Sequence, residues 1–301
     1  MTITRRLRYL LEFIAVWCLV KLFGLLPLDT ASALGGAIAR TLGPRLGVSR
    51  RAARNIERAL PEKTPAEVKA IVYGMWDNLG RTAAEIPHFA RLDMYDGSGR
   101  FEFVDGDIID NLRDDDIGAV FFTGHVGNWE LTALSVLQRG LPLTTVYRQA
   151  NNPYVEKFLS ELRRPVSGTM LVPKGSKGAR SLISALKNND HLGLLVDQKM
   201  NDGIAVPFFG RDAMTAPALA QLAMRFNVPI VPGRNVRLGG ARFRVIYEHA
   251  IEPANTGNRD EDVRETMRRV NAHIEGWIRE HPEQWLWLHN RWPDDNKETE
   301  T

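Results

Sequence analysis

Short apolar segments alternate with segments of helical character from residue 100 onward, and this alternation constrains the fold more than any other feature of the sequence. Candidate strands lie at 101–104, 117–122, 142–147, 169–172, 191–196, 229–236 and 241–248. Candidate helices lie at 129–138, 153–163, 177–188, 215–226 and 260–280. Because this alternation is typical of parallel sheets with crossover helices, the sequence predicts an α/β fold with a mostly parallel central sheet flanked by helices. Gly239 and Gly240, between the last two strands, predict a β-hairpin.

The N-terminal segment 9–28 is almost wholly apolar and has about the 20 residues that a bilayer span needs. Glu12 and Lys21 interrupt it, and its longest uncharged stretch, 13–20, is too short to cross. We therefore expect a partly inserted or interfacial helix with Trp17 near the lipid headgroups, and a tilted single span is the alternative.

A cleaved signal peptide is a further interpretation of the same segment. Three arginines precede the apolar run, and Ala31–Ala33 resembles a cleavage site. Lys21 argues against it, because it breaks the apolar region early.

Charge is distributed unevenly along the chain, whose net charge is +3. Residues 1–60 hold ten basic and three acidic side chains, so the remainder is acidic overall. A basic residue beside an anionic lipid surface contributes about 1 kcal/mol to membrane binding. A nucleic-acid partner is not expected, since no basic stripe interleaved with aromatic residues recurs later in the chain.

These features divide the chain into three parts. Membrane-anchoring helices are expected over 1–60, ending with a basic amphipathic helix at 49–60, and the α/β domain over 61–293. Thr64 and Pro65 predict the start of the next helix. Residues 294–301 form a polar tail, and the single cysteine, Cys18, excludes an intrachain disulfide and a cysteine-based zinc site.

The strongest local motif is the segment 119–130, an apolar strand that continues into a glycine-containing turn and a helix. It places His125 at the carboxyl end of a strand, where open α/β sheets bind ligands. Asn128 is a candidate N-cap, with Glu130 in the first helical turn. On one continuous helix His125 and Glu130 would point roughly 140° apart, but across a turn they can converge.

A histidine held by a carboxylate is a general base for an alcohol, and such catalysis contributes typically ~10²–10⁴-fold. That suffices to help a hydroxyl attack an acyl thioester directly, and the sequence has no G-x-S-x-G elbow for a serine nucleophile. The structural alternative is a capping histidine and a glutamate favoured by the helix dipole. The spacing of His125 and Glu130 alone does not separate these two interpretations.

The segment resembles the H-x4-D/E motif of glycerolipid acyltransferases, and its context resembles the lipid A late acyltransferase family of the lauroyl- and myristoyl-transferase type. The supporting stretches occur in the family's order: 59–62, Val146–Arg148 with Asn151–Pro153, Leu195–Gln198, Val206–Gly210 with Thr215, and Pro282–Trp292. Together they cover nearly the whole chain.

The resemblance implies that His125 is the base, Glu130 its partner and Arg148 an active-site cation. An arginine after a strand could bind phosphate or an oxyanion, and a surface ion pair is the alternative. Asp197 and Gln198 also end a strand, so we expect them on the same edge of the sheet. Asp197 could instead serve only as a turn and N-cap residue.

Lys174, Lys177 and Arg180 surround glycines before a helix, a composition that can bind phosphate, although the P-loop spacing is absent. A solvated loop is the alternative. If these residues bind a ligand, it is either the phosphate of the acceptor or an acidic carrier protein. His289 and Arg291 are expected to be structural partners near the site, and Asn290 stands where the family pattern leads us to expect a basic residue.

The resemblance implies an acyltransferase at the cytoplasmic face of a bacterial inner membrane. Its donor would be an acyl-carrier protein and its acceptor a lipid A precursor, with neither metal nor cofactor. One alternative is an enzyme for another acceptor, of the phosphatidylinositol-mannoside or ornithine-lipid type, with acyl-CoA as donor. The other is a non-catalytic lipid-binding scaffold.

Overall fold

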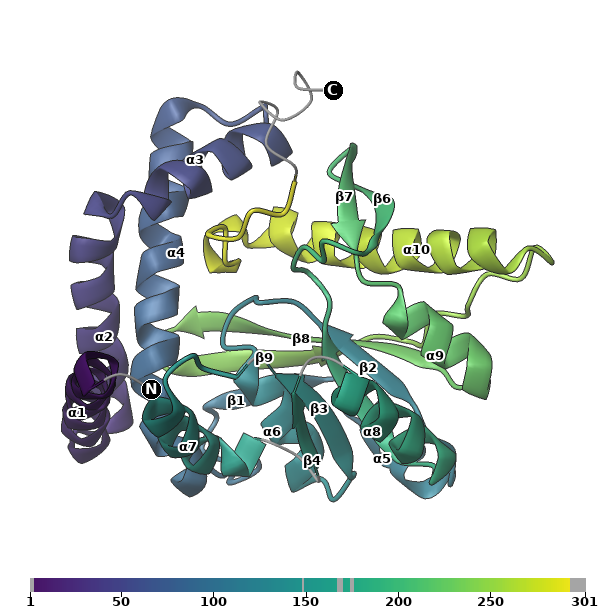
Figure 1. Cartoon of the computed structure of the whole chain (residues 1–301), viewed down its shortest axis with the longest axis horizontal. Coiled ribbons are helices and arrows are strands. Elements are labelled where there is room, and N and C mark those ends of the chain that lie inside the picture. Colours follow the sequence, from purple (N-terminus) through teal and green to yellow (C-terminus); the bar gives the residue numbers. More distant parts are fainter. Residues whose placement is uncertain (1–2, 148, 167–169, 174–175, 293–301) are drawn as a thin grey trace.

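A computed structural model describes residues 3–147, 149–166, 170–173 and 176–292. Its centre is a seven-stranded sheet in the order β1-β9-β8-β2-β5-β3-β4 (Figure 1). The strands are β1 (Phe101–Val104), β2 (Val120–Thr123), β3 (Leu143–Tyr147), β4 (Met170–Pro173), β5 (His191–Leu195), β8 (Ile230–Gly239) and β9 (Arg242–Tyr247). All neighbours are parallel except the β8–β9 hairpin. The predicted mostly parallel α/β sheet is therefore confirmed.

Helices surround this sheet. The α-helices are α1 (Ile3–Leu25), α2 (Leu28–Leu42), α3 (Val48–Ala59), α4 (Pro65–Glu85), α5 (Asp107–Asp114), α6 (Glu130–Gln138), α7 (Pro153–Leu162), α8 (Ser176–Lys187), α9 (Ala218–Phe226) and α10 (Arg259–Glu280). Short 3-10 helices are η1 (Gly43–Arg45), η2 (Ile86–Arg91), η3 (Arg164–Val166) and η4 (Pro282–Gln284). The helix predicted from residue 215 begins only at Ala218, because Thr215 ends a strand.

That strand belongs to a two-stranded sheet that the sequence did not predict. β6 (Ile204–Phe208) and β7 (Arg211–Thr215) pair antiparallel across Phe209 and Gly210. Both connecting residues have positive φ, 52° and 68°, as tight hairpin turns require. Proline is disfavoured inside strands, so Pro207 concealed this hairpin.

The sheet divides the apolar core in two, and β2 shows how. Successive side chains of a strand point to opposite faces. Val120 and Phe122 pack in a cluster with α4, α9, α10 and the C-terminal tryptophans. Ala119 and Phe121 pack on the other face with α6 and β9. This burial on both faces explains the continuous apolar run before His125.

The first four helices stand together at one end of the sheet (Figure 1). α2 lies directly on α4, since a Cβ added to Gly35 would come within 2.5 Å of the Gly80 carbonyl oxygen. Thr64 and Glu67 form a capping box at the start of α4, which confirms the predicted helix start. The predicted basic amphipathic helix is α3, with Arg50 and Arg54 exposed.

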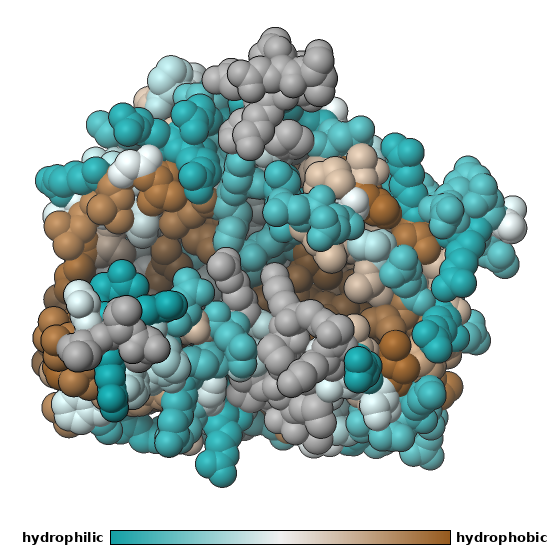
Figure 2. Space-filling view, viewed as in Figure 1, coloured by the Kyte–Doolittle hydropathy of each residue, from teal (hydrophilic) through white to brown (hydrophobic). Residues whose placement is uncertain are grey.

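α1 and α2 expose large apolar side chains. Leu11 and Leu25 of α1 are 68% and 84% exposed, and Leu34 and Ile38 continue the apolar surface on α2. Figure 2 shows this surface as the brown area at the left edge, where Figure 1 places these helices. None of the described helices has the length and hydropathy to cross a bilayer.

One face of α1 is nonetheless bound to the protein. Asn152, the N-cap of α7, donates to the Tyr9 carbonyl oxygen at 2.8 Å and to Glu12 Oε2 at 3.0 Å. The Phe13 ring packs against Phe158 of α7. Glu12, which interrupts the apolar segment of the sequence, therefore faces α7.

Candidate active site

His125 lies in the turn that joins β2 to α6, at the carboxyl edge of the sheet. β5 is the parallel neighbour of β2, so both strands end at this edge. Asp197 and Gln198 follow the last residue of β5, Leu195. The structure brings all three side chains together, as expected for residues that follow adjacent parallel strands.

The carboxylate of Asp197 holds both the ring and the backbone of His125. Oδ1 lies 2.8 Å from His125 Nδ1, and Oδ2 accepts from the backbone N–H of His125 at 2.7 Å. The indole N–H of Trp285 donates to the same Oδ2 at 2.7 Å. The side chains of His125 and Asp197 are only 13% and 2% exposed. This arrangement fixes the ring and favours the tautomer with its proton on Nδ1.

The pKa of Asp197 reflects two opposing effects. Burial alone would raise it, but the charge of His125 and the hydrogen bonds from His125 and Trp285 outweigh burial. The pKa of Asp197 is therefore held well below its usual value. Asp197 is a carboxylate at neutral pH, so it can stabilise an imidazolium at His125.

The other ring nitrogen of His125 contacts Gln198. The amide nitrogen of Gln198 lies 3.1 Å from His125 Nε2 and 2.7 Å from His289 Nε2. With the His125 proton on Nδ1, Nε2 accepts this hydrogen bond. Gln198 therefore occupies the direction in which Nε2 would accept a proton from a substrate.

The structure places Glu130 differently from the sequence prediction. Its carboxylate pairs with Arg163 at 3.0 Å, while the carboxylate on His125 Nδ1 belongs to Asp197. The reason lies in the positions of the two carboxylates. Glu130 is the first residue of α6, whereas Asp197, which follows the adjacent strand β5, already contacts the His125 ring. The direct His125–Glu130 contact is thus replaced by a His125–Asp197 contact.

Asn128 is not the N-cap that the sequence predicted. Trp129 holds that position, without a side-chain capping hydrogen bond. The amide of Asn128 instead donates to buried Glu85 at 2.8 Å. Asn78 donates to the carbonyl oxygen of the neighbouring Gly127 at 2.9 Å, and the Gly127 N–H donates to the Gln284 carbonyl oxygen at 3.1 Å. The turn is therefore anchored to the body of the protein.

Arg291 is fully buried behind the site, as expected for a structural residue. Its guanidinium donates to the Met214 carbonyl oxygen at 2.9 Å and to Thr215 Oγ1 at 2.8 Å, which fixes the end of β7. Burial lowers the pKa of Arg291 to about 10, although the charge of Asp197 opposes this shift.

The model of the bacterial lipid A biosynthesis acyltransferase family matches residues 2–294. The chain belongs to this family. It is 23% identical to a lipid A biosynthesis acyltransferase of Haemophilus influenzae, over 89% of this chain and 83% of the relative. It is also 23% identical to a lipid A biosynthesis myristoyltransferase of Escherichia coli, over 81% of this chain and 75% of the relative.

Membership in the lipid A acyltransferase family confirms the family named from the sequence and identifies the chain as a transferase. It also gives the His125–Asp197 pair a chemical context, because acyl transfer to a hydroxyl requires removal of a proton. The described residues of this acyltransferase contain no group of three His, Cys, Asp or Glu side chains suited to a metal ion.

The structure describes only some of the basic residues that were predicted to bind substrate. Arg148 and Lys174 lie outside the described residues, and Lys177 lies in α8 without a described side chain. Arg180 is exposed on α8, and the described contacts do not join it to His125. Their roles as substrate-binding residues stay predictions.

Sequence reasoning expected His289 near the site, where it contacts Gln198, but it missed Trp285 as a partner of Asp197. Both belong to the C-terminal segment whose backbone pairs with the His125 turn through Val126 and Trp285. The density of tryptophan and histidine in 285–292 was a visible signal, but a linear sequence does not reveal which strand end such a segment contacts.

Proposed function

We propose that this lipid A acyltransferase family member moves a fatty acyl chain from an acyl-carrier-protein thioester to a hydroxyl group of a lipid A precursor. His125 is the general base. The observation that carries the proposal is the 2.8 Å contact between His125 Nδ1 and Asp197, at the ligand-binding edge of the sheet, in a chain of this family.

The reaction follows from this geometry. The acceptor hydroxyl replaces Gln198 at His125 Nε2, and its oxygen attacks the thioester carbonyl carbon while Nε2 takes its proton. Asp197 stabilises the imidazolium that forms. The tetrahedral intermediate then collapses, the C–S bond breaks, and the leaving thiolate takes the proton back from Nε2. Base and carboxylate thus return to their starting state, and no acyl-enzyme forms.

Glu130 takes part in this proposed mechanism indirectly, through its ion pair with Arg163. The pair at 3.0 Å holds a guanidinium near the end of α7, beside the first turn of α6. A guanidinium fork is suited to phosphate or a developing oxyanion. We propose that Glu130 orients this cation, and that Arg148, Lys174, Lys177 and Arg180 serve the acceptor phosphate or the carrier protein.

Attachment to the cytoplasmic face of the inner membrane is part of the proposal. The exposed apolar side chains of α1 and α2 form a continuous surface, while Glu12 and Phe13 pack against α7. A helix that is held by protein on one face and apolar on the other is suited to lie in a lipid interface. Exposed Arg50 and Arg54 on α3 would add attraction to anionic headgroups.

Acyl transfer by the purified full-length chain tests the proposal. The chain is incubated in vesicles with a lipid A precursor and either acyl-carrier-protein or acyl-CoA donor, and products are identified by mass spectrometry. We expect an added ester-linked acyl chain with the carrier-protein donor and none with His125→Ala. Absence of transfer by folded wild-type protein with either donor would overturn the proposal.

The lipid profile of a deletion strain tests the acceptor. Loss of one secondary acyl chain from lipid A is expected. Intact lipid A together with loss of an acyl chain from another lipid would assign the enzyme to that lipid instead.

A further inference from the structure

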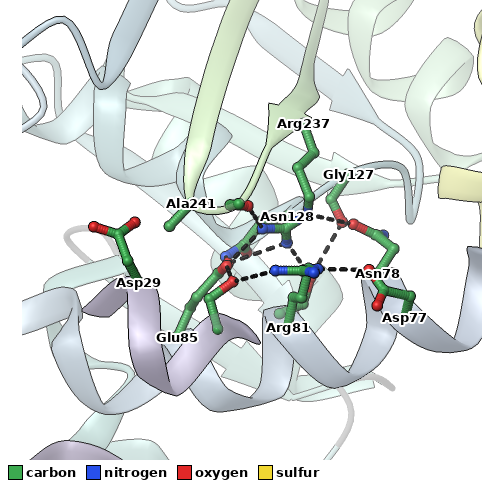
Figure 3. Close-up of polar contacts among 12 residues, drawn as sticks. Asp29, Asp77, Asn78, Arg81, Glu85, Gly127, Asn128, Arg237 and Ala241 are labelled. Carbon is green, nitrogen blue, oxygen red and sulfur yellow. Dashed lines mark hydrogen bonds and ion pairs between the residues drawn. The ribbon is translucent and has the colours of Figure 1, made fainter. Parts of the chain in front are cut away.

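A buried polar cluster that contacts the His125 turn at Asn128 takes no part in the mechanism above. Its centre is Glu85, the last residue of α4, which is 2% exposed. Arg237 of β8 donates to both of its carboxylate oxygens, at 2.5 Å and 3.1 Å. Ser32 of α2 donates at 2.7 Å and the Asn128 amide at 2.8 Å. Figure 3 shows Glu85, Arg237 and Asn128 converging from separate elements.

The same cluster holds the backbone of the turn. The Gly127 carbonyl oxygen accepts from Asn78 at 2.9 Å and from Thr82 at 3.3 Å. Asn235 of β8 accepts from the Asn128 N–H at 2.9 Å and donates to its carbonyl oxygen at 2.7 Å. The backbone of the two residues is therefore fixed from α4 and from β8.

Gly127 shows how closely the surroundings fit this turn. Its φ is +58°, a conformation that side-chain-bearing residues rarely adopt. A Cβ at this position would come within 2.4 Å of the Asn235 carbonyl oxygen. The Gly127 backbone therefore packs so closely against β8 that a side chain at this position would clash with it.

We propose that Glu85, Arg237 and Asn128 form a turn clamp, a set of positioning residues that sets where the His125 ring lies. His125 is three residues before Asn128, and the backbone between them is also bound by Gln284 and Leu286 of the C-terminal segment. Asp197 holds the ring and the backbone N–H of His125, and the turn clamp holds the turn at Asn128. The inference rests on the proposed function, because it assigns these residues to the acyl-transfer step.

Burial of an ion pair is costly in desolvation and is not in itself a strong source of stability. A role in specifying geometry accounts for four donors converging on one carboxylate next to a reactive turn. Misplacement of a reacting group by about 1 Å can lower a rate by about 10²-fold. Substrate binding need not change, since Glu85, Asn128 and the side chain of Arg237 are almost fully buried.

The chain offers a matched control on the same strand. Arg234, like Arg237, is a largely buried arginine of β8, and it pairs with Glu280 at 2.7 Å. Each guanidinium also lies over an aromatic ring, at 5.7 Å from Trp277 for Arg234 and at 4.6 Å from Phe243 for Arg237. Of these two arginines, only Arg237 contacts Glu85.

The experiment measures kcat, KM and thermal unfolding for Arg237→Met and Arg234→Met in the full chain. We expect kcat to fall about ten- to hundredfold in Arg237→Met with KM within about threefold of wild type. Arg234→Met should keep the wild-type kcat. Equal kcat in the two variants, or a change in unfolding temperature alone, would overturn the inference.

A second pair of variants, at Ser32 and Asn128, leaves the Glu85–Arg237 ion pair in place. It tests the inference if Arg237→Met does not fold. Ser32 and Asn128 each donate one hydrogen bond to Glu85, but only Asn128 belongs to the turn. Asn128→Ala should lower kcat by about tenfold and Ser32→Ala should not.

Failure of this inference can be told from failure of the proposed function. If wild type transfers acyl chains, His125→Ala does not, and both clamp variants keep full kcat, only the inference fails. If folded wild type transfers no acyl chain, the proposed function fails first.

Discussion

The His125 turn and the α1–α2 pair differ in how their side chains are accommodated. Around the turn, two buried carboxylates find partners within the protein: Asp197 binds His125, and Glu85 binds Asn128. On α1 and α2, large apolar side chains such as Leu11 and Leu25 remain exposed. One region is completed by the fold, and the other is suited to completion by a lipid surface. The proposed chemistry and the proposed membrane attachment therefore involve different parts of the molecule and can be tested separately.

The largest expected effect is on the chemistry. His125→Ala removes the base and should lower kcat by up to about 10⁴-fold, with little change in membrane binding. Steady-state kinetics and vesicle sedimentation measure the two properties on the same preparation. Near-normal turnover by a folded variant would remove His125 from the mechanism.

A large effect is expected on membrane binding when the apolar surface is charged. Leu11→Glu with Leu25→Glu should weaken binding to anionic vesicles more than about tenfold, since burial of each leucine contributes about 1.5–3 kcal/mol. Val104→Glu with Ile117→Glu, at exposed apolar positions of the α/β domain, is the matched control. Equal binding by both double variants would show that α1 does not meet the lipid.

A smaller effect concerns stability and pH. The pKa of Asp197 is depressed in the folded protein, so its contribution to stability is present above its unfolded value of about 3.9 and is lost as pH falls further. The difference in unfolding free energy between wild type and Asp197→Asn should therefore shrink as the pH falls from about 6, roughly two units above that value, to about 3, roughly one unit below it. Denaturant titrations measure it, and a constant difference would contradict the assigned shift.

The smallest effect should leave both regions unchanged. Thr64→Ala removes the capping box of α4 and should cost about 1 kcal/mol of unfolding free energy. Acyl transfer and vesicle binding should match those of wild type. A loss of either activity would mean that α4 transmits changes from its far end to the turn.

Local patterns predicted much of the fold. The strand expected at 101–104 is β1, and the cap at Thr64 begins α4, because a short apolar run and a capping box are specified by neighbours in sequence. The hairpin of β6 and β7 was missed because Pro207 and the turn at Phe209 do not resemble strand and turn residues. Such local exceptions are stabilised by tertiary packing, which a pattern does not contain.

The sequence predicted three members of the site but not the carboxylate that pairs with His125. His125, Asp197 and Gln198 were all placed at one edge of the sheet, because each follows a strand. The sequence assigned Glu130 to His125 by proximity, whereas β2 and β5 are neighbours in the sheet and bring Asp197 there instead. The turn clamp could not be predicted, since Glu85 and Arg237 come from segments far apart in the chain.

The acid limb of the kcat profile tests the pairing of His125 most directly. If Asp197 stabilises the imidazolium, Asp197→Asn should lower kcat by about 10²-fold or more and move the acid limb to lower pH. Glu130→Gln should leave the position of that limb unchanged, because Glu130 pairs with Arg163. A limb that moves in Glu130→Gln and stays in place in Asp197→Asn would contradict the account.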